Sequence, residues 1–272
     1  MQGRLSPPVD GRIQAFPWLS WREEFPVAER NGFQLMEWTL DQDRLHENPL
    51  MTAAGQAEIR ELSLRHRVRV ASLTGDCFMQ APFWKAKGAE RESLQRDFRE
   101  VAAACAAVGV SIIVVPLVDG GRLDDPEQEE VLVSFLRSQA GVLSAQGLTV
   151  AFECDFAPAE LARLMGRFDS ASFGVNYDIG NSAALGFRPS DEFAAYGRRV
   201  VNVHIKDRVR GGSTVPLGRG AADFEAVFEA LARIGYHGNC ILQTARADDG
   251  DHAGILCRFR DMTQDWLNRY EA

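Results

Sequence analysis

The sequence has few cysteines and none at close spacing. Its five cysteines are Cys77, Cys105, Cys154, Cys240 and Cys257, an odd number with no CxxC pair among them. A disulfide scaffold and a cysteine-type zinc site are therefore not expected. This cysteine usage is typical of a reducing compartment, so the expected location is the cytoplasm.

Positive charge is also scarce. The 272 residues include 38 acidic and 30 basic side chains, which gives a net charge of −8 at pH 7. Because binding of nucleic acid or of an anionic membrane needs clustered cations, neither is expected as a partner. The expected partner is a small molecule, and the sequence leaves a homodimer open.

One uncharged run, residues 101–118, reaches the length of a membrane-spanning helix. Its first half is mostly alanine, Gly109 suits the end of a helix, and the β-branched residues at 111–115 are typical of a buried strand. The run therefore predicts a soluble helix followed by a strand. The first residues of the chain lack the apolar stretch of a signal peptide.

A pattern of helix, glycine, short apolar run and polar loop recurs along the chain. Glycines at 32, 109, 147 and 235 precede apolar runs, and each suits the left-handed conformation that ends a helix. Helix starts are indicated by a capping-box pattern at Ser20-x-x-Glu23, by Asn48 and Asp125 before prolines, and by Asp223.

These signals predict eight strand–helix units. Strands are expected near 1–3, 35–38, 69–74, 111–117, 149–155, 173–178, 200–206 and 240–244, and helices near 21–31, 49–66, 87–107, 126–146, 158–167, 189–197, 223–234 and 253–269. Strands separated by helices run parallel, so the expected fold is a single α/β domain over residues 1–272, a (β/α)₈ TIM barrel. No GxGxxG follows the first strand, so a Rossmann fold has no support. The strand at 1–3 is either very short or continues from a native start upstream.

Four successive strands carry a polar residue among apolar ones. Since side chains alternate along a strand, apolar neighbours facing the helices leave Glu153, Asp178, His204 and Gln243 facing the barrel axis. All four stand near the C-terminal ends of their strands, where barrel enzymes place their chemistry. Two carboxylates, an imidazole and an amide oxygen suit Mn²⁺, Co²⁺, Zn²⁺ or Mg²⁺. The alternative is a polar core in which they pair with Asn176, Asn202 and Lys206.

Other polar residues near strand ends are candidates to hold a ligand. Glu37 and Asp76 are as consistent with solvated strand-end carboxylates as with ligand contacts. Lys206 is expected either to bind a substrate oxygen or to pair with Asp178 or Glu153. The loop that carries Arg208 and Arg210 is either an anion-binding site or a mobile lid.

Four motifs make the sequence resemble the xylose isomerase-like TIM-barrel superfamily of sugar and sugar-phosphate isomerases and epimerases. They are FECD at 152–155, YDIGN at 177–181, VHIKD at 203–207 and VPLGRGAADF at 215–224. The resemblance covers nearly the whole chain and is greatest to the L-ribulose/L-xylulose 5-phosphate 3-epimerase group. It implies carbohydrate metabolism and a divalent metal held by Glu153, Asp178, His204 and the strand-8 position.

The strand-8 position departs from the family pattern, because it holds Gln243 where the family has a second glutamate. The resemblance implies proton transfer through an enediolate, with catalytic roles for Glu153 and position 243. The residues expected to contact the substrate are Glu37, Asn181, Lys206 and Arg210. An amide cannot exchange a proton near neutral pH, so Glu153 acting alone favours isomerisation over 3-epimerisation.

Three alternatives stay open at this point. A non-catalytic barrel that binds a sugar or a partner would explain Gln243 as lost chemistry. A lyase or dehydratase acting on an inositol-like ketone would use the same site. An endonuclease-IV-like nuclease would need several inward histidines, and the strands offer only His204.

Overall fold

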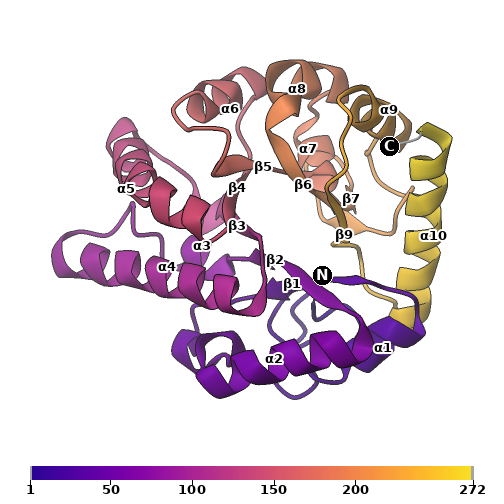
Figure 1. The fold of residues 1–272 in the computed structure, drawn as a ribbon. Helices are drawn as coiled ribbons and strands as arrows, with labels where there is room; N and C mark the ends of the chain where they lie inside the picture. Colours follow the sequence, from indigo (N-terminus) through magenta and orange to yellow (C-terminus); the bar gives the residue numbers. More distant parts are fainter. Residues whose placement is uncertain (1, 271–272) are drawn as a thin grey trace.

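The computed structural model describes residues 2–270 of the chain. Seven parallel strands form one sheet: β1 (Leu35–Thr39), β2 (Arg69–Thr74), β3 (Ile112–Leu117), β4 (Thr149–Cys154), β5 (Phe173–Asp178), β6 (Val200–Ile205) and β9 (Asn239–Leu242). They pair in this order, each with its neighbour in sequence apart from the β6–β9 pair, which spans the insertion of a small hairpin. The strands curve into a nearly closed barrel (Figure 1).

Helices form the outer ring around these strands (Figure 1). The longer ones are α2 (Ala53–His66), α4 (Gly88–Val108), α5 (Pro126–Ala145), α9 (Phe224–Arg233) and α10 (His252–Tyr270), joined by α1 (Glu24–Arg30), α6 (Pro158–Met165) and α8 (Pro189–Tyr196). The expected α/β TIM barrel is confirmed. It follows from strands whose apolar residues pack against amphipathic helices on one side and against each other on the other.

The strand expected at residues 1–3 is absent from the described part. Met1 lies outside the described residues, and Gln2 and Gly3 form a turn rather than a strand. Gly3 has a φ of +77°, which turns the chain away from an extended path. The Gln2 amide nevertheless donates a 2.8 Å hydrogen bond to the carbonyl of Glu37 in β1. The sheet therefore has seven strands, and β1 and β9, at the two ends of its order, are not hydrogen-bonded to each other.

Most helix ends lie where the sequence predicts them. Gly32, Gly109, Gly147 and Gly235 all have positive φ, and the side chains of Asn48, Asp125 and Asp223 accept capping hydrogen bonds. The prediction of a capping box at Ser20 is wrong. The carbonyl of Ser20, rather than its hydroxyl, accepts the amides of Glu23 and Glu24, so the chain enters α1 through a preceding turn.

The sequence analysis did not predict several short elements as separate from the main strands and helices. These are the helices α3 (Asp76–Gln80) and α7 (Ile179–Leu185), the hairpin strands β7 (Asp207–Arg208) and β8 (Thr214–Val215), and the single 3₁₀ turns η1 (Leu45–Glu47), η2 (Pro49–Met51), η3 (Asp119–Gly121) and η4 (Gly197–Arg199). They are too short to show a periodic apolar pattern.

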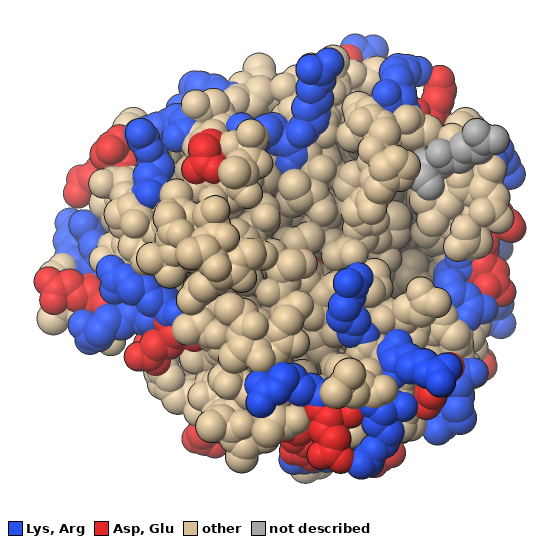
Figure 2. Space-filling model, viewed as in Figure 1, with Lys and Arg blue, Asp and Glu red and all other residues tan. Residues whose placement is uncertain are grey.

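The uncharged run 101–118 folds as predicted, into the end of α4 and strand β3. Within residues 2–270, no helix combines the length and apolar character needed to cross a bilayer. On the face shown in Figure 2, charged side chains of both signs lie mainly around the rim, and the central part is mostly uncharged. This face therefore carries no broad patch of one sign.

Candidate active site

A cavity of about 590 Å³ opens at the C-terminal ends of the strands. Its lining includes Thr74, Pro116, Glu153, Lys206 and Gln243, which come from the ends of five different strands. The loops that follow the strands complete the wall, among them those of Gln14, Asp76, Asn181 and Arg208. The cavity therefore occupies the end of the barrel where this fold places its active sites.

Three of the four predicted inward residues meet beside this cavity, and Glu153 is the one of them that lines it. Glu153, Asp178 and His204 are all buried, and one side-chain ligand atom from each lies within 4.8 Å of the others. The His204 Nδ1 atom is 3.2 Å from a Glu153 oxygen and 3.8 Å from Asp178 Oδ2. Register explains part of this meeting, because Asp178 in β5 pairs directly with His204 in β6.

Glu37 holds the other side of the His204 ring. Its Oε1 atom is 2.8 Å from His204 Nε2, and its carboxylate also accepts hydrogen bonds from Ser72, Thr74 and Asn202. Glu37 is fully buried in the middle of β1 and does not line the cavity, so its expected contact with substrate is not what the structure shows. It is placed to orient the histidine, because it contacts the Nε2 side of the ring while Nδ1 faces Glu153 and Asp178.

The charges of this cluster stabilise one another. Burial alone raises the pKa of Glu37, but the adjacent His204 outweighs burial and lowers it to about 2. Burial likewise raises the pKa of Asp178, and the Lys206 ammonium and His204 bring it below the ordinary value. Burial lowers the pKa of His204, whereas Glu37, Asp178 and Glu153 together raise it well above 6.5. Glu37 and Asp178 are therefore ionised at neutral pH, where they pair with His204 and Lys206.

The polar-core alternative describes a second layer of the same site. Asn176 donates a 2.8 Å hydrogen bond to Glu153 and accepts one of 2.7 Å from Asn202. Asn202 also reaches Glu37 at 3.1 Å. These two amides join the carboxylates from below, so pairing with asparagines and convergence on one point occur together.

Lys206 and Gln243 lie side by side above the cluster. Lys206 Nζ donates to Asp178 Oδ2 at 3.2 Å and to Gln243 Oε1 at 2.9 Å. Gln243 Nε2 donates to Gln14 at 3.1 Å. The predicted pairing of Lys206 with Asp178 is therefore present. Gln243 shares the cavity with Glu153, but its oxygen is directed at an ammonium.

Two glycines of the motifs allow backbone to pack closely around these residues. A Cβ on Gly180 would lie 2.7 Å from Lys206 Cγ, and a Cβ on Gly220 would overlap the Asp207 carboxylate. Asp207 accepts the amides of Gly218, Gly220 and Ala222. The aspartate of VHIKD therefore fixes the loop VPLGRGAADF, which explains why the two motifs occur together.

Asn181 links the cluster to the loop after β6. It donates 2.8 Å to Glu153 Oε1 through Nδ2, and its Oδ1 accepts a 2.9 Å hydrogen bond from Arg208. Its backbone amide is capped by Asp178. The predicted Arg210 does not line the cavity. It is exposed, with its guanidinium against Gly186 at the end of α7, and Arg208 lines the cavity instead.

The N-terminal loop supplies two residues that the sequence analysis did not identify. Gln14 donates a 2.7 Å hydrogen bond to Asp76 and also accepts from Gln243. Arg4 is buried, and it reaches Gln14 and the carbonyl of Thr244. Burial raises the pKa of Asp76 to about 7, with the nearby carboxylates adding to the shift. No periodic pattern marks this loop, so only three-dimensional contact could reveal its residues.

The donor set fits a divalent metal ion. Glu153 and Asp178 oxygens and the His204 Nδ1 atom converge, and the second ring nitrogen of the histidine contacts a carboxylate. That carboxylate–histidine arrangement is the one that metal-binding histidines use to fix their tautomer. A metal bound there would compete with Lys206 for Asp178.

Comparison with known proteins identifies the family to which this barrel belongs. The family model described as xylose isomerase-like TIM barrel matches residues 25–259. The chain belongs to this family. The match spans all seven barrel strands and the three clustered residues, and the resemblance predicted from the four motifs is confirmed.

Among curated proteins, the chain is similar to an L-ribulose-5-phosphate 3-epimerase of Escherichia coli O1:K1 / APEC. The two are 25% identical over 250 residues, which cover 89% of this chain and 88% of the relative. A solved L-ribulose 3-epimerase has a TM-score of 0.74 at 15% identity, covering 93% of this chain and 90% of that one. A D-psicose 3-epimerase solved with D-fructose also has a TM-score of 0.74, at 14% identity and with 90% and 93% coverage. The homologues of this chain are thus sugar epimerases and isomerases of the same family.

Proposed function

We propose that this protein is a metal-dependent isomerase or epimerase of a keto-sugar or sugar phosphate, with Glu153 as the acid/base group. The observation that carries the proposal is the convergence of Glu153, Asp178 and His204 beside a cavity of about 590 Å³ that Glu153 lines. Membership of the xylose isomerase-like family and the names of its relatives support the choice of substrate class.

Glu153, Asp178 and His204 would hold the metal, with Gln243 as a weaker or water-bridged fourth group. A bound divalent ion, Mn²⁺, Co²⁺, Zn²⁺ or Mg²⁺, would supply Lewis-acid polarisation next to the ketone. Glu153 is the carboxylate of the cluster that also lines the cavity. It would take the proton from the carbon beside the ketone and return it to the substrate.

Neighbouring side chains would hold the sugar. Lys206 and Asn181 both line the cavity and carry hydrogen-bond donors, Asn181 beside Glu153 and Lys206 beside Asp178. Lys206 Nζ could exchange its bond to Gln243 for a substrate oxygen. Arg12 and Arg208 lie in the wall of the same cavity and would favour a phosphorylated substrate.

Gln243 bears on which reaction is catalysed. A 3-epimerisation removes a proton from one face of a carbon and returns it to the other, whereas a 1,2-isomerisation needs only one base on one face. Since an amide cannot exchange protons near neutral pH, we propose that C3 epimerisation is weak in this protein. Gln243→Glu should tighten metal binding and raise proton exchange at C3. An unchanged metal affinity with rapid C3 epimerisation by the wild type would contradict the one-base argument.

The function is tested by measuring metal binding and proton exchange together. Mn²⁺ is titrated into metal-stripped wild type and Asp178→Asn, and each is then incubated in D₂O with a panel of ketopentoses and their phosphates. The proposal expects one bound ion and deuterium at C1 or C3 for the wild type, with both lost in the variant. Metal-independent exchange would contradict the metal's role. Sugar binding without exchange would favour a non-catalytic barrel.

A further inference from the structure

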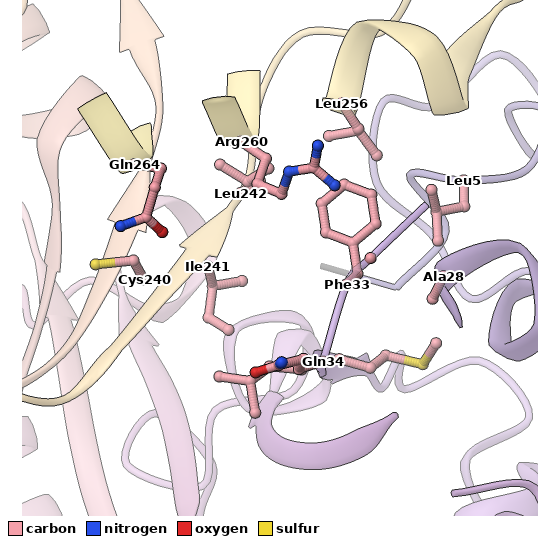
Figure 3. A pocket seen from close by; sticks show the side chains of 13 residues that line it. Leu5, Ala28, Phe33, Gln34, Cys240, Ile241, Leu242, Leu256, Arg260 and Gln264 are labelled. Atoms are coloured by element: carbon pink, nitrogen blue, oxygen red, sulfur yellow. The ribbon is translucent and has the colours of Figure 1, made fainter. Parts of the chain in front are cut away.

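Two cavities of the molecule differ in the chemistry that their walls offer. The smaller one, of about 320 Å³, lies against β1 and β9 and is bordered in Figure 3 by apolar side chains such as Phe33 and Leu256. Its wall contains Arg260, which stays charged, and Cys240, whose pKa burial raises to about 12. Neither group exchanges a proton readily near neutral pH. Further acid–base chemistry is therefore found in the other cavity, at the C-terminal ends of the strands.

That cavity has a second buried acid besides Glu153. Asp76 begins α3 directly after β2, lines the cavity and is only 7% exposed. Pro116 of β3, which pairs directly with Glu153 in β4, also lines the cavity and contributes no polar side-chain group. The wall therefore presents the two acids from β2 and β4, on either side of a strand that carries no competing side chain.

The other ionisable groups of this wall are arginines, which stay charged, or side chains that are already bonded or exposed. They are Arg12, Arg208, Lys206 bonded to Asp178, Asp155 paired with Arg122, Asp41 bonded to Gln80, and the exposed Asp119. Asp76 and Glu153 are thus the two buried acids among the lining residues.

A chain of hydrogen bonds fixes how Gln14 meets Asp76. Because Lys206 can only donate, Gln243 turns Oε1 toward its Nζ atom at 2.9 Å and Nε2 toward Gln14 Oε1 at 3.1 Å. Arg4, another donor, faces the same Gln14 oxygen at 3.4 Å. Gln14 Nε2 is left to donate to Asp76 Oδ2 at 2.7 Å. Since Oδ2 accepts this hydrogen bond, a protonated Asp76 carries its proton on Oδ1.

The surroundings of Asp76 keep this proton exchangeable near neutral pH. Burial raises the pKa of Asp76 to about 7, and the negative charges of Asp41, Glu153 and Glu37 act in the same direction. The nearby cation Arg4 acts in the opposite direction. An acid whose pKa lies near the working pH both donates and accepts protons efficiently.

We propose that Asp76 is the second acid–base residue of the site, and that the reaction it serves interconverts a ketose and an aldose. This inference rests on the proposed function. Glu153 takes a proton from C1 of the ketose and leaves an enediolate across C1 and C2. Asp76 gives its Oδ1 proton to O2 and then takes the proton from O1, while the C1 carbonyl forms and Glu153 returns its proton to C2.

The protons and electrons of this sequence balance. C1 is oxidised and C2 is reduced within one molecule, so no co-reactant is needed. Glu153 ends ionised and Asp76 ends protonated, as both began. The scheme uses one carboxylate for the carbon-bound proton, which agrees with Gln243 at the strand-8 position, and assigns the oxygen-bound proton to a different wall of the cavity.

The test separates the proton on carbon from the proton on oxygen. Wild type, Asp76→Asn and Asp119→Asn are loaded with Mn²⁺ and incubated in D₂O with ketopentoses and their phosphates, and NMR follows deuterium at C1 and the formation of aldose. The proposal expects Asp76→Asn to lose at least about 100-fold in aldose formation, with C1 exchange kept within about tenfold of the wild type. Asp119→Asn should match the wild type in both.

The pH dependence gives a second readout. Asp76 must be protonated when the ketose reacts, and its pKa is about 7. The ratio of aldose formation to C1 exchange should therefore fall above pH 7 in the wild type, by about tenfold per pH unit. In Asp76→Asn the same ratio should not depend on pH.

The possible failures are distinguishable. Unchanged aldose formation in Asp76→Asn, or an equal loss of aldose formation and C1 exchange, would overturn the role of Asp76 and leave the proposed function standing. Wild-type exchange that yields a C3 epimer and no aldose would overturn the ketose–aldose assignment. Absence of exchange by the wild type with every ketose would overturn the proposed function, and this inference with it.

Discussion

Two buried glutamates, Glu192 in α8 and Glu153 in β4, have different surroundings. Glu192 accepts hydrogen bonds from the hydroxyls of Tyr177, Ser182 and Tyr196, and the cavity beside it measures only about 20 Å³. Glu153 lies next to His204 and Asp178 and lines a cavity of about 590 Å³. Burial raises the pKa of Glu192, and neutral donors only partly offset this effect.

The difference separates a carboxylate that stabilises structure from one that serves a site. Both are expensive to bury, but the partners of Glu192 are neutral hydroxyl groups, which donate hydrogen bonds to it without carrying charge. Glu153 lies among ionisable groups, His204 and Asp178, and beside a cavity that a ligand can enter. Charged neighbours together with accessible volume, more than burial, therefore identify the functional glutamate.

Asp76 should give the largest effect on stability. It lines the same cavity as Glu153 and is buried like Glu192. Its folded-state pKa of about 7 lies above the ordinary 3.8, so the folded protein holds this proton more tightly. The stabilisation is complete below pH 4 and is lost as the pH rises to about 7, by ~1.4 kcal/mol per unit and roughly 4 kcal/mol in total.

Asp76→Asn should therefore remove this slope from the free energy of unfolding. The measurement is denaturant unfolding of wild type and variant at several pH values between 4 and 8, with Asp119→Asn as the control. Asp119 lines the same cavity but is exposed. Parallel curves for wild type and Asp76→Asn would show that this carboxyl titrates normally.

Glu37 tests whether the histidine needs its buried partner. Glu37→Gln keeps the size of the side chain but weakens the contact with His204 Nε2. Loss of such a supporting carboxylate typically costs 10–100-fold in metal affinity. Mn²⁺ titration should show this loss, and the pH dependence of binding should shift to lower pH because His204 loses a neighbouring negative charge. A change in stability without either shift would make Glu37 purely structural.

Glu192 is expected to give the smallest effect. Glu192→Gln leaves one of its hydroxyl donors poorly paired and should destabilise the fold by about 1–2 kcal/mol. Its metal affinity and solvent-proton exchange should equal those of the wild type. Urea unfolding and Mn²⁺ titration of the same preparation check both points, and a loss of metal affinity would remove the contrast with Glu153.

The sequence predicted the barrel well because glycine ends, caps and apolar runs are local signals. Strand phase was enough to bring Glu153, Asp178 and His204 together, since alternation sets which way each side chain points. How deeply each side chain is buried was harder to predict. Glu37 stands at a register irregularity in β1, and its burial depends on neighbouring strands.

Loop residues were the least predictable part of the site. Gln14 lines the cavity and Arg4 contacts Gln14, and both lie in a segment without periodicity. Arg208 lines the cavity while Arg210 does not, because the β7–β8 hairpin sets their directions. The first barrel position was misassigned for a similar reason. So few residues leave no pattern, and the structure shows a turn at Gln2 and Gly3 with one hydrogen bond from Gln2 to Glu37 instead of a strand.

The most direct test of the central claim is solvent-proton exchange by Glu153→Gln. Wild type and variant are loaded with the same metal and incubated in D₂O with the ketose or ketose phosphate that the wild type exchanges fastest, and deuterium incorporation is followed by NMR. If Glu153 moves the proton, the variant should bind metal and lose at least 10³-fold in exchange rate, about 4 kcal/mol of barrier. Exchange within tenfold of the wild type, at equal metal occupancy, would contradict the assignment of Glu153 as the acid/base group.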